Sequence, residues 1–184
     1  GGPRAAPGRY YARIRYGTDS AEVDFHILSD PNYKESEEAC QEQVQFLLQV
    51  RDKFNKIQKT VKDIRALRNQ VKELVGKLDS PLVKSFQPLA GNINKRLTGI
   101  EEALYQTKAK AGEDILNFPM RLNDRMAALY NVAASGNNPP TSQVKEAFKE
   151  LSNETDRELN KFDLIIRDDV AAFNKLILEK QVPV

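Results

Sequence analysis

An apolar heptad repeat between about residues 34 and 78 constrains this chain more than any other feature of its sequence. Nine of the ten a and d positions are apolar, and Arg68 is the exception. The period predicts one helix, which at 1.5 Å rise per residue would be roughly 65 Å long and would need other helices beside it. In chain order the positions are Leu47, Val50, Phe54, Ile57, Val61, Ile64, Arg68, Val71, Val75 and Leu78.

Proline-marked breaks predict where the helices begin. Asp30 is suited to cap the first helix and Pro31 to occupy its first position. Ser80 and Pro81 repeat this signal before a second helix, whose apolar residues recur at steps of three and four. This helix is predicted to return along the first. A third helix is expected to start near Pro119.

A fourth helix is predicted after a loop at residues 135–140, where glycine, asparagine and proline cluster. Thr141 is suited to cap it, and residues 182–184 are expected to leave it. Its apolar face comprises Val144, Phe148, Leu151, Leu159, Phe162, Ile166, Val170, Phe173 and Ile177. The sequence therefore predicts a mainly α fold, an antiparallel bundle of about four long helices. Its predicted shared core includes Leu47, Phe54, Ile57, Ile64, Leu89, Ile93, Phe148, Phe162 and Phe173.

The first thirty residues alternate apolar and polar side chains, which is the period of a β-strand. Two such runs flank a predicted turn at residues 17–20, so they form a β-hairpin. Its polar face would set Arg13 and Arg15 against Glu22 and Asp24. Two strands alone are marginally stable in water, so the hairpin must pack on the helices or belong to a larger sheet. We favour the second interpretation, with residues 1–30 as the end of a truncated β-sandwich and residues 31–184 as the helical bundle.

Composition excludes several classes of partner. The chain has 28 basic and 26 acidic side chains and a net charge of +2, so no strong field would attract nucleic acid. No apolar run approaches the roughly 20 residues that a membrane-spanning helix needs. The single cysteine, Cys40, excludes an internal disulfide and a zinc site built from cysteines.

Residues that could carry catalysis are few, and each fits the protein surface better. His26 is the only histidine and follows acidic neighbours in a strand, so we expect it to be exposed. Neighbouring acids in a helix do not face one another, so solvated surface is expected for three adjacent pairs. These pairs are Glu37 with Glu38, Glu101 with Glu102, and Asp168 with Asp169. Phosphate-binding, paired-histidine and nucleophilic-serine motifs are also missing. We therefore predict no catalytic, cofactor-binding or metal-ligating residue and no cofactor.

Arg68 is unusual because it occupies an otherwise apolar seam. It could pair with an acid on a facing helix, or its aliphatic part could pack on the seam while its charge reaches water. The second arrangement is the more common, and we expect it here. The nearby lysines alternate with acids and are expected to form a solvated face: Lys53, Lys56, Lys59 and Lys62.

Several short motifs resemble a known family. They are residues 115–123, Pro139-Pro140-Thr141, Ala172-Phe173-Asn174 and Val182-Pro183, with Pro7 to Arg13 and Asp30-Pro31 upstream. They resemble the strands and C-terminal helices of bacterial exported proteins that carry a sortilin-like β-propeller of BNR repeats. Those proteins are commonly labelled glycosyl hydrolases.

The resemblance implies a function without catalysis in this segment. Any hydrolytic activity would belong to the propeller, and the sequence contains no propeller blades, so no family catalytic residue is carried over. It implies a structural, accessory C-terminal module whose partners are the upstream β-sandwich and β-propeller of its own chain. It also implies a periplasmic, cell-surface or secreted location. The alternative is a stand-alone helical module that binds a partner or itself, with an enzyme as the weakest hypothesis and the oligomeric state left open.

Overall fold

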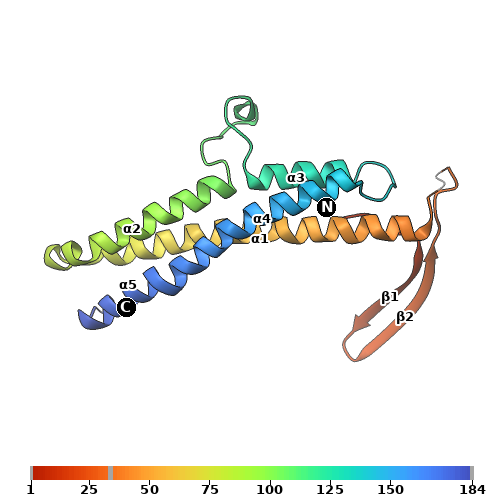
Figure 1. Cartoon of the computed structure of the whole chain (residues 1–184). Coiled ribbons are helices and arrows are strands. Elements are labelled where there is room, and N and C mark those ends of the chain that lie inside the picture. The colour runs from red at the N-terminus through yellow and green to blue at the C-terminus, as the bar shows by residue number, and fades with distance from the viewer. Residues whose placement is uncertain (1, 33–34, 183–184) are drawn as a thin grey trace. The chain divides into compact units, whose positions relative to one another are not determined.

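The computed structural model describes residues 2–32 and 35–182 of the chain (Figure 1). It is 67% helical, with four helices and an N-terminal two-stranded hairpin, which confirms the predicted mainly α fold. The predicted exit of residues 183 and 184 from the last helix lies outside the described residues.

The described residues form nine elements in chain order. The fourth helix runs through α4, η2 and α5 without a break, and η2 is a π-helical turn within it. The elements are β1 (Gly8–Tyr16), β2 (Asp19–Ile27), α1 (Glu37–Gly76), α2 (Ser80–Leu104), the 3₁₀ turn η1 (Gly112–Leu116), α3 (Leu122–Ala133), α4 (Ser142–Leu164), η2 (Ile165–Val170) and α5 (Ala171–Glu179).

The chain divides into two compact units. The first contains the described residues up to Asp52 and the segment Ala128–Phe148. The second contains Lys53–Ala127 and the described residues from Lys149 onward. The hairpin therefore groups with the start of α1, and the predicted domain boundary at residue 30 stays a prediction.

The helix starts differ in part from those predicted. Ser36 caps α1, because its Oγ accepts a hydrogen bond from the Ala39 N–H at 3.2 Å. Asp30 does not cap this helix, because its carboxylate accepts from the N–H of Asn32 and closes a local turn instead. Capping by Thr141 is confirmed by its 3.3 Å hydrogen bond from the Val144 N–H.

The start of α2 also differs by one residue. Its cap is Asp79, whose carboxylate accepts a hydrogen bond from the N–H of Leu82 at 3.2 Å. Ser80, the predicted cap, is instead the first residue of the helix, with Pro81 in the same turn. A carboxylate at this place also interacts favourably with the positive end of the helix dipole.

In the first unit, the starts of α1 and α4 lie side by side and run in the same direction. Glu42 pairs with Lys145 at 2.6 Å, and further along both helices the rings of Phe46 and Phe148 meet edge to face at 5.3 Å. Gln43 is buried, and its amide donates to the carbonyl of Ala133 at 2.9 Å. This bond ties the end of α3 to α1.

In the second unit, α2 runs antiparallel to α1. Arg65 contacts Glu101, whereas the later Arg68 contacts Asn94, which precedes Glu101 in the chain. The rings of Phe86 in α2 and Phe173 in α5 pack edge to face at 5.3 Å. Both rings are buried, so they hold α5 against α2.

The apolar seam of α1 is largely buried within the chain. Six of its ten positions are buried, and the other four are half-buried, namely Phe54, Arg68, Val75 and Leu78. The nine residues predicted to share a core are divided between the units, because Leu47 and Phe148 belong to the first and the others to the second. Within this set Phe54, Leu89 and Phe148 are half-buried and the remaining six are buried.

The π-helical turn η2 contains one departure from the predicted apolar face of the fourth helix. Ile165 is fully buried, whereas Ile166, predicted on the apolar face, is 44% exposed. The prediction for Ile166 is wrong, because Ile165 takes the buried position at the start of this turn, three residues after the buried Phe162. Phe173 and Ile177 beyond the turn are buried as predicted.

Candidate docking surface on the hairpin

The hairpin is closed by the two-residue loop Gly17-Thr18. The predicted turn at residues 17–20 was two residues longer, because Asp19 and Ser20 belong to β2. Tyr16 lies opposite Asp19, and the register continues without a bulge to Gly8 opposite Ile27. Gly17 has φ +59, a conformation that suits the first central position of a type II′ turn. Such a turn matches the twist of the flanking strands, so the two nine-residue strands pair over their whole length.

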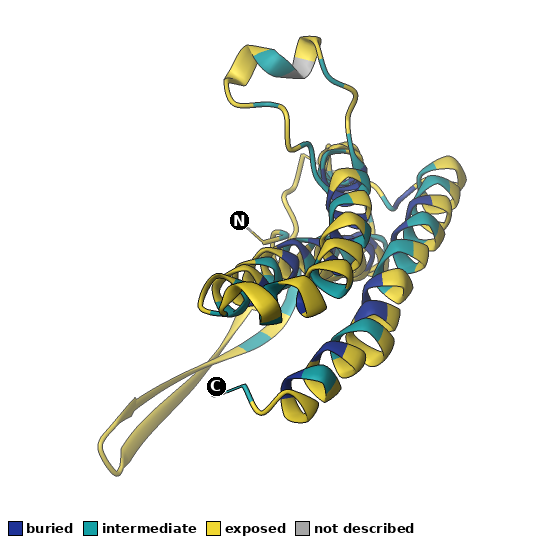
Figure 2. Cartoon of the chain, turned by 90° about the vertical axis from the view of Figure 1, so that its left-hand side faces the viewer, coloured by how far each residue is buried: buried dark blue, intermediate teal, exposed yellow. Residues whose placement is uncertain are grey.

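One face of the hairpin is apolar and uncovered. The register sets Tyr10 opposite Phe25, and their rings stack with centroids 6.0 Å apart. Further toward the tip, Ile14 is 75% exposed and Val23 is 62% exposed. Figure 2 shows the strands in the colour of exposed residues over nearly their whole length. Three or more strands, or a covering helix, are normally needed to stabilise such a face, and among the described residues the sheet has two strands.

The opposite face is polar and internally paired. Arg9 forms an ion pair with Asp24 at 2.9 Å, and Arg13 forms one with Glu22 at 2.5 Å. The predicted opposition of Arg13 and Glu22 is thus confirmed. Arg15 instead lies across from Ser20. These charges are exposed and stabilise the hairpin little.

The hairpin contacts the helices near its base. The Tyr10 hydroxyl donates to the carbonyl of Ala6 at 2.8 Å, and Ala6 is buried. His26 lies 3.8 Å from Glu37 at the start of α1, a contact that becomes an ion pair only when the imidazole is protonated. The side chain of His26 is half exposed, as predicted, and that of Glu37 equally so. The base therefore has a polar contact with the start of α1, while the apolar face beyond it is exposed.

Glu101 is a correction to the predicted solvated surface. Its side chain is only 7% exposed and accepts hydrogen bonds or ion pairs from both Arg65 and Arg68 at 2.7 Å. Burial raises the pKa of this carboxyl, but the two guanidinium groups lower it more, so the pKa lies below its ordinary value. Arg68 is therefore paired across the α1 and α2 seam rather than only extended toward water.

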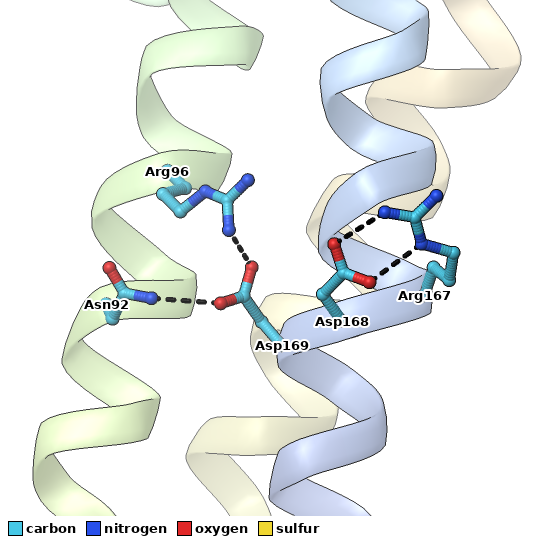
Figure 3. Close-up of polar contacts among 5 residues, drawn as sticks. All are labelled: Asn92, Arg96, Arg167, Asp168 and Asp169. Carbon is cyan, nitrogen blue, oxygen red and sulfur yellow. Dashed lines mark hydrogen bonds and ion pairs between the residues drawn. The ribbon is translucent and has the colours of Figure 1, made fainter.

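Asp169 also departs from the predicted solvated surface. Its side chain is 13% exposed and bonds to Arg96 and, at 3.0 Å, to the amide of Asn92, both on α2 (Figure 3). Asp168 turns the other way and bonds to its exposed neighbour Arg167. Of these two adjacent acids in η2, Asp169 therefore contacts α2 and Asp168 faces solvent.

The remaining candidates form structural contacts. The predicted solvated face is wrong for Lys53, which is largely buried and pairs with Asp156 at 2.7 Å. Lys59 is exposed as predicted and pairs with Asp63 on the same helix. The thiol of Cys40 is half-buried, 4.0 Å from the carbonyl of Asn137. Within residues 2–32 and 35–182, no three potential metal ligands come together. None of the helices in this described part is both long and apolar enough to cross a bilayer.

Comparison with known proteins does not extend these observations. No protein-family model, curated protein or solved structure matches the chain. The resemblance to sortilin-like propeller proteins therefore stays a prediction.

Proposed function

We propose that this segment is a non-catalytic, structural accessory module that docks through its N-terminal hairpin onto a β-sheet layer of a larger protein. The observation that carries the proposal is the uncovered apolar face of a hairpin whose opposite face is charged and ion-paired. Residues on the two faces alternate along each strand, as they do where a sheet packs on one side only. The surface therefore has the pattern of an outer sheet without its inner partner.

Docking would stabilise both partners by removing apolar area from water. Fully burying a large apolar side chain stabilises by about 1.5–3 kcal/mol, and Ile14, Val23 and Phe25 are each at least 45% exposed. Sheets stacked face to face lie about 10 Å apart with their side chains interdigitated. A β-sandwich partner would meet these requirements along the whole length of the strands.

The family resemblance suggests which protein this partner belongs to. We propose the upstream β-sandwich of the same chain, followed in that protein by a β-propeller, with the helices as a supporting body outside the cell. Any glycosidase activity would then lie in the propeller. Turnover of aryl glycosides by this segment, abolished by a point mutation within it, would contradict the proposal.

The alternative function is a stand-alone helical module that binds a partner or itself. Its support was the heptad repeat of α1, because a free apolar seam would favour a coiled-coil dimer. Six seam positions are buried against the rest of this chain, so the repeat is accounted for without a second copy. Solution mass distinguishes the two functions, since the alternative predicts a dimer.

The proposal is tested by extending the chain upstream to include a complete sandwich. We expect a higher melting temperature and less self-association than in the present chain, because the apolar face and one strand edge would be covered. Equal stability and an equally monomeric state in both proteins would show that the helices already satisfy the hairpin. That result would remove the main support for docking.

A further inference from the structure

We propose that the outer edge of β1 receives an additional strand whose residues are acidic on the polar face and apolar on the other. This inference rests on the proposed docking function and specifies the edge and chemistry involved. Two features of the structure support it. They are the direction of the backbone N–H and C=O groups and the distribution of charged side chains between the edges of β1 and β2.

The register determines which backbone groups are open. A two-residue loop makes Tyr16 and Asp19 a hydrogen-bonded pair, and the unbroken register repeats such pairs at every second residue. The residues between them direct their N–H and C=O groups away from the hairpin. On β1 these residues are Arg9, Tyr11, Arg13 and Arg15, and on β2 they are Ser20, Glu22, Asp24 and His26. Their side chains all lie on the polar face.

The two edges therefore carry opposite charge. Three of the four outward-bonding residues of β1 are arginines, whereas those of β2 include two acids and no arginine or lysine. Arg9 and Arg13 are each paired across the hairpin, but among the described residues Arg15 forms no ion pair. A strand added beside β1 would set its own residues directly opposite these arginines. Acidic residues there would be favourable, and basic ones unfavourable.

The same distribution of charge argues against a second copy of the chain as the added strand. A two-fold symmetric contact between two β1 edges would set arginines against arginines, and one between two β2 edges would set acids against acids. Pairing β1 of one copy with β2 of the next would match charges, but it does not close and would build open-ended assemblies. The arginines thus disfavour pairing with the β1 edge of another copy and favour an acidic strand.

The opposite face of the added strand follows from the pleat. Its alternate residues would lie beside Tyr10, Ala12 and Ile14, which form the uncovered apolar face. An apolar residue at each of these places would widen the face from two strands to three. The expected partner sequence therefore alternates acidic and apolar residues over about the nine residues of β1.

The test uses the full chain and two labelled peptides of the length of β1. One alternates valine with glutamate, and the other has lysine in place of each glutamate. We expect the acidic peptide to bind about tenfold more tightly, as judged by fluorescence anisotropy, because several cross-strand charge pairs reverse sign. Equal binding of both peptides, or tighter binding of the basic peptide, would overturn the inference.

Proline variants identify the edge. Tyr11 on β1 and Ser20 on β2 both direct their N–H outward, so Tyr11→Pro and Ser20→Pro each remove one outward donor and leave the bonds inside the hairpin. We expect Tyr11→Pro to weaken binding of the acidic peptide about tenfold and Ser20→Pro to change it less than about twofold. The reverse order would assign the added strand to β2 and overturn the inference while leaving docking intact.

Amide exchange in the unsubstituted chain covers the case in which a proline variant fails to fold. Saturating acidic peptide should slow exchange at Arg9, Tyr11, Arg13 and Arg15, while the outward amides of β2 stay fast. Protection confined to β2 would overturn the inference and leave docking intact. No protection on either strand would refute the inference. The proposed function would be refuted only if upstream extension also left the melting temperature and the self-association of the chain unchanged. A solution mass that grows with chain concentration without peptide would instead indicate pairing of β1 with β2 of another copy, and would likewise overturn it.

Discussion

The Nη1 atom of Arg68 lies 2.7 Å from the Oε2 atom of Glu101, joining α1 to α2 within a seam that is otherwise largely apolar. Arg65 bonds to the other oxygen of the same carboxylate and lies 5.1 Å from the ring of Tyr105. One buried carboxylate thus pairs with two guanidinium groups. This arrangement fixes the register of the two helices more narrowly than apolar contacts alone.

Replacing Glu101 tests the value of this network. We predict that Glu101→Gln lowers the free energy of unfolding by about 1–3 kcal/mol, because charge-assisted bonds are lost and Arg68 is left partly buried without an anion. The matched control is Glu102→Gln on the exposed side of the same turn, for which a change within about 0.5 kcal/mol is expected. Urea denaturation measures both variants. Equal effects would show that the network contributes nothing particular to stability.

The pH dependence of stability provides a second test of Glu101. Its pKa in the folded chain lies below the ordinary value of 4.5, because the arginines outweigh the effect of burial. The unfolded chain therefore binds this proton first, so the stabilisation is complete above about pH 5 and is lost as the pH falls through the lowered pKa. We predict that the stability difference between the wild type and Glu101→Gln shrinks as pH decreases from about 5 toward 3. A constant difference over this range would contradict the assigned cause.

Adjacent acids in the π-helical turn offer a matched pair of variants. Asp169→Ala removes the bonds to Arg96 and Asn92 on α2, and we predict a loss of about 1–3 kcal/mol with faster amide exchange in α5. Asp168→Ala removes only an exposed contact with its neighbour, so a small effect is expected. If the two variants lose equal stability in thermal denaturation, Asp169 does not hold the helices together.

The core assignment of the fourth helix is tested beside the same turn. Phe162 is 9% exposed, and we predict that Phe162→Ala costs about 3–5 kcal/mol. Ile166→Ala is the control, because this side chain is 44% exposed and a change near or below about 0.5 kcal/mol is expected. An unchanged denaturation midpoint for Phe162→Ala would show that the assigned face is wrong.

The elements that depend on local pattern could be predicted from the sequence. Heptad spacing predicted α1, alternation predicted both strands, and the hydroxyl of Thr141 predicted the start of α4. The cap of α1 was missed because Asp30 has the right chemistry but bonds within its own turn, which leaves capping to Ser36. Capping strength alone does not decide between two competing local bonds.

The features that depend on contacts between helices could not be predicted from the sequence. Whether Arg68 meets an acid depends on which side of α2 faces α1. A usable signal was present, because Glu101 follows Ile93 and Leu97 at steps of four and so interrupts one apolar stripe as Arg68 interrupts another. The π-helical turn left no comparable signal, since the residues 165–170 fit an α-helical period and the contact of Asp169 with Arg96 forms only between packed helices.

Amide hydrogen exchange can decide whether the hairpin is an incomplete sheet. The measurement compares the inward-bonded amides of the hairpin, such as those of Ala12, Ile14 and Val23, in this chain and in a chain extended upstream by a sandwich. We predict little protection in the present chain, because two strands without a covering layer open readily, and protection approaching that of α1 in the extended chain. Hairpin amides that are already as protected as those of α1 in the present chain, and unchanged by the extension, would contradict the account.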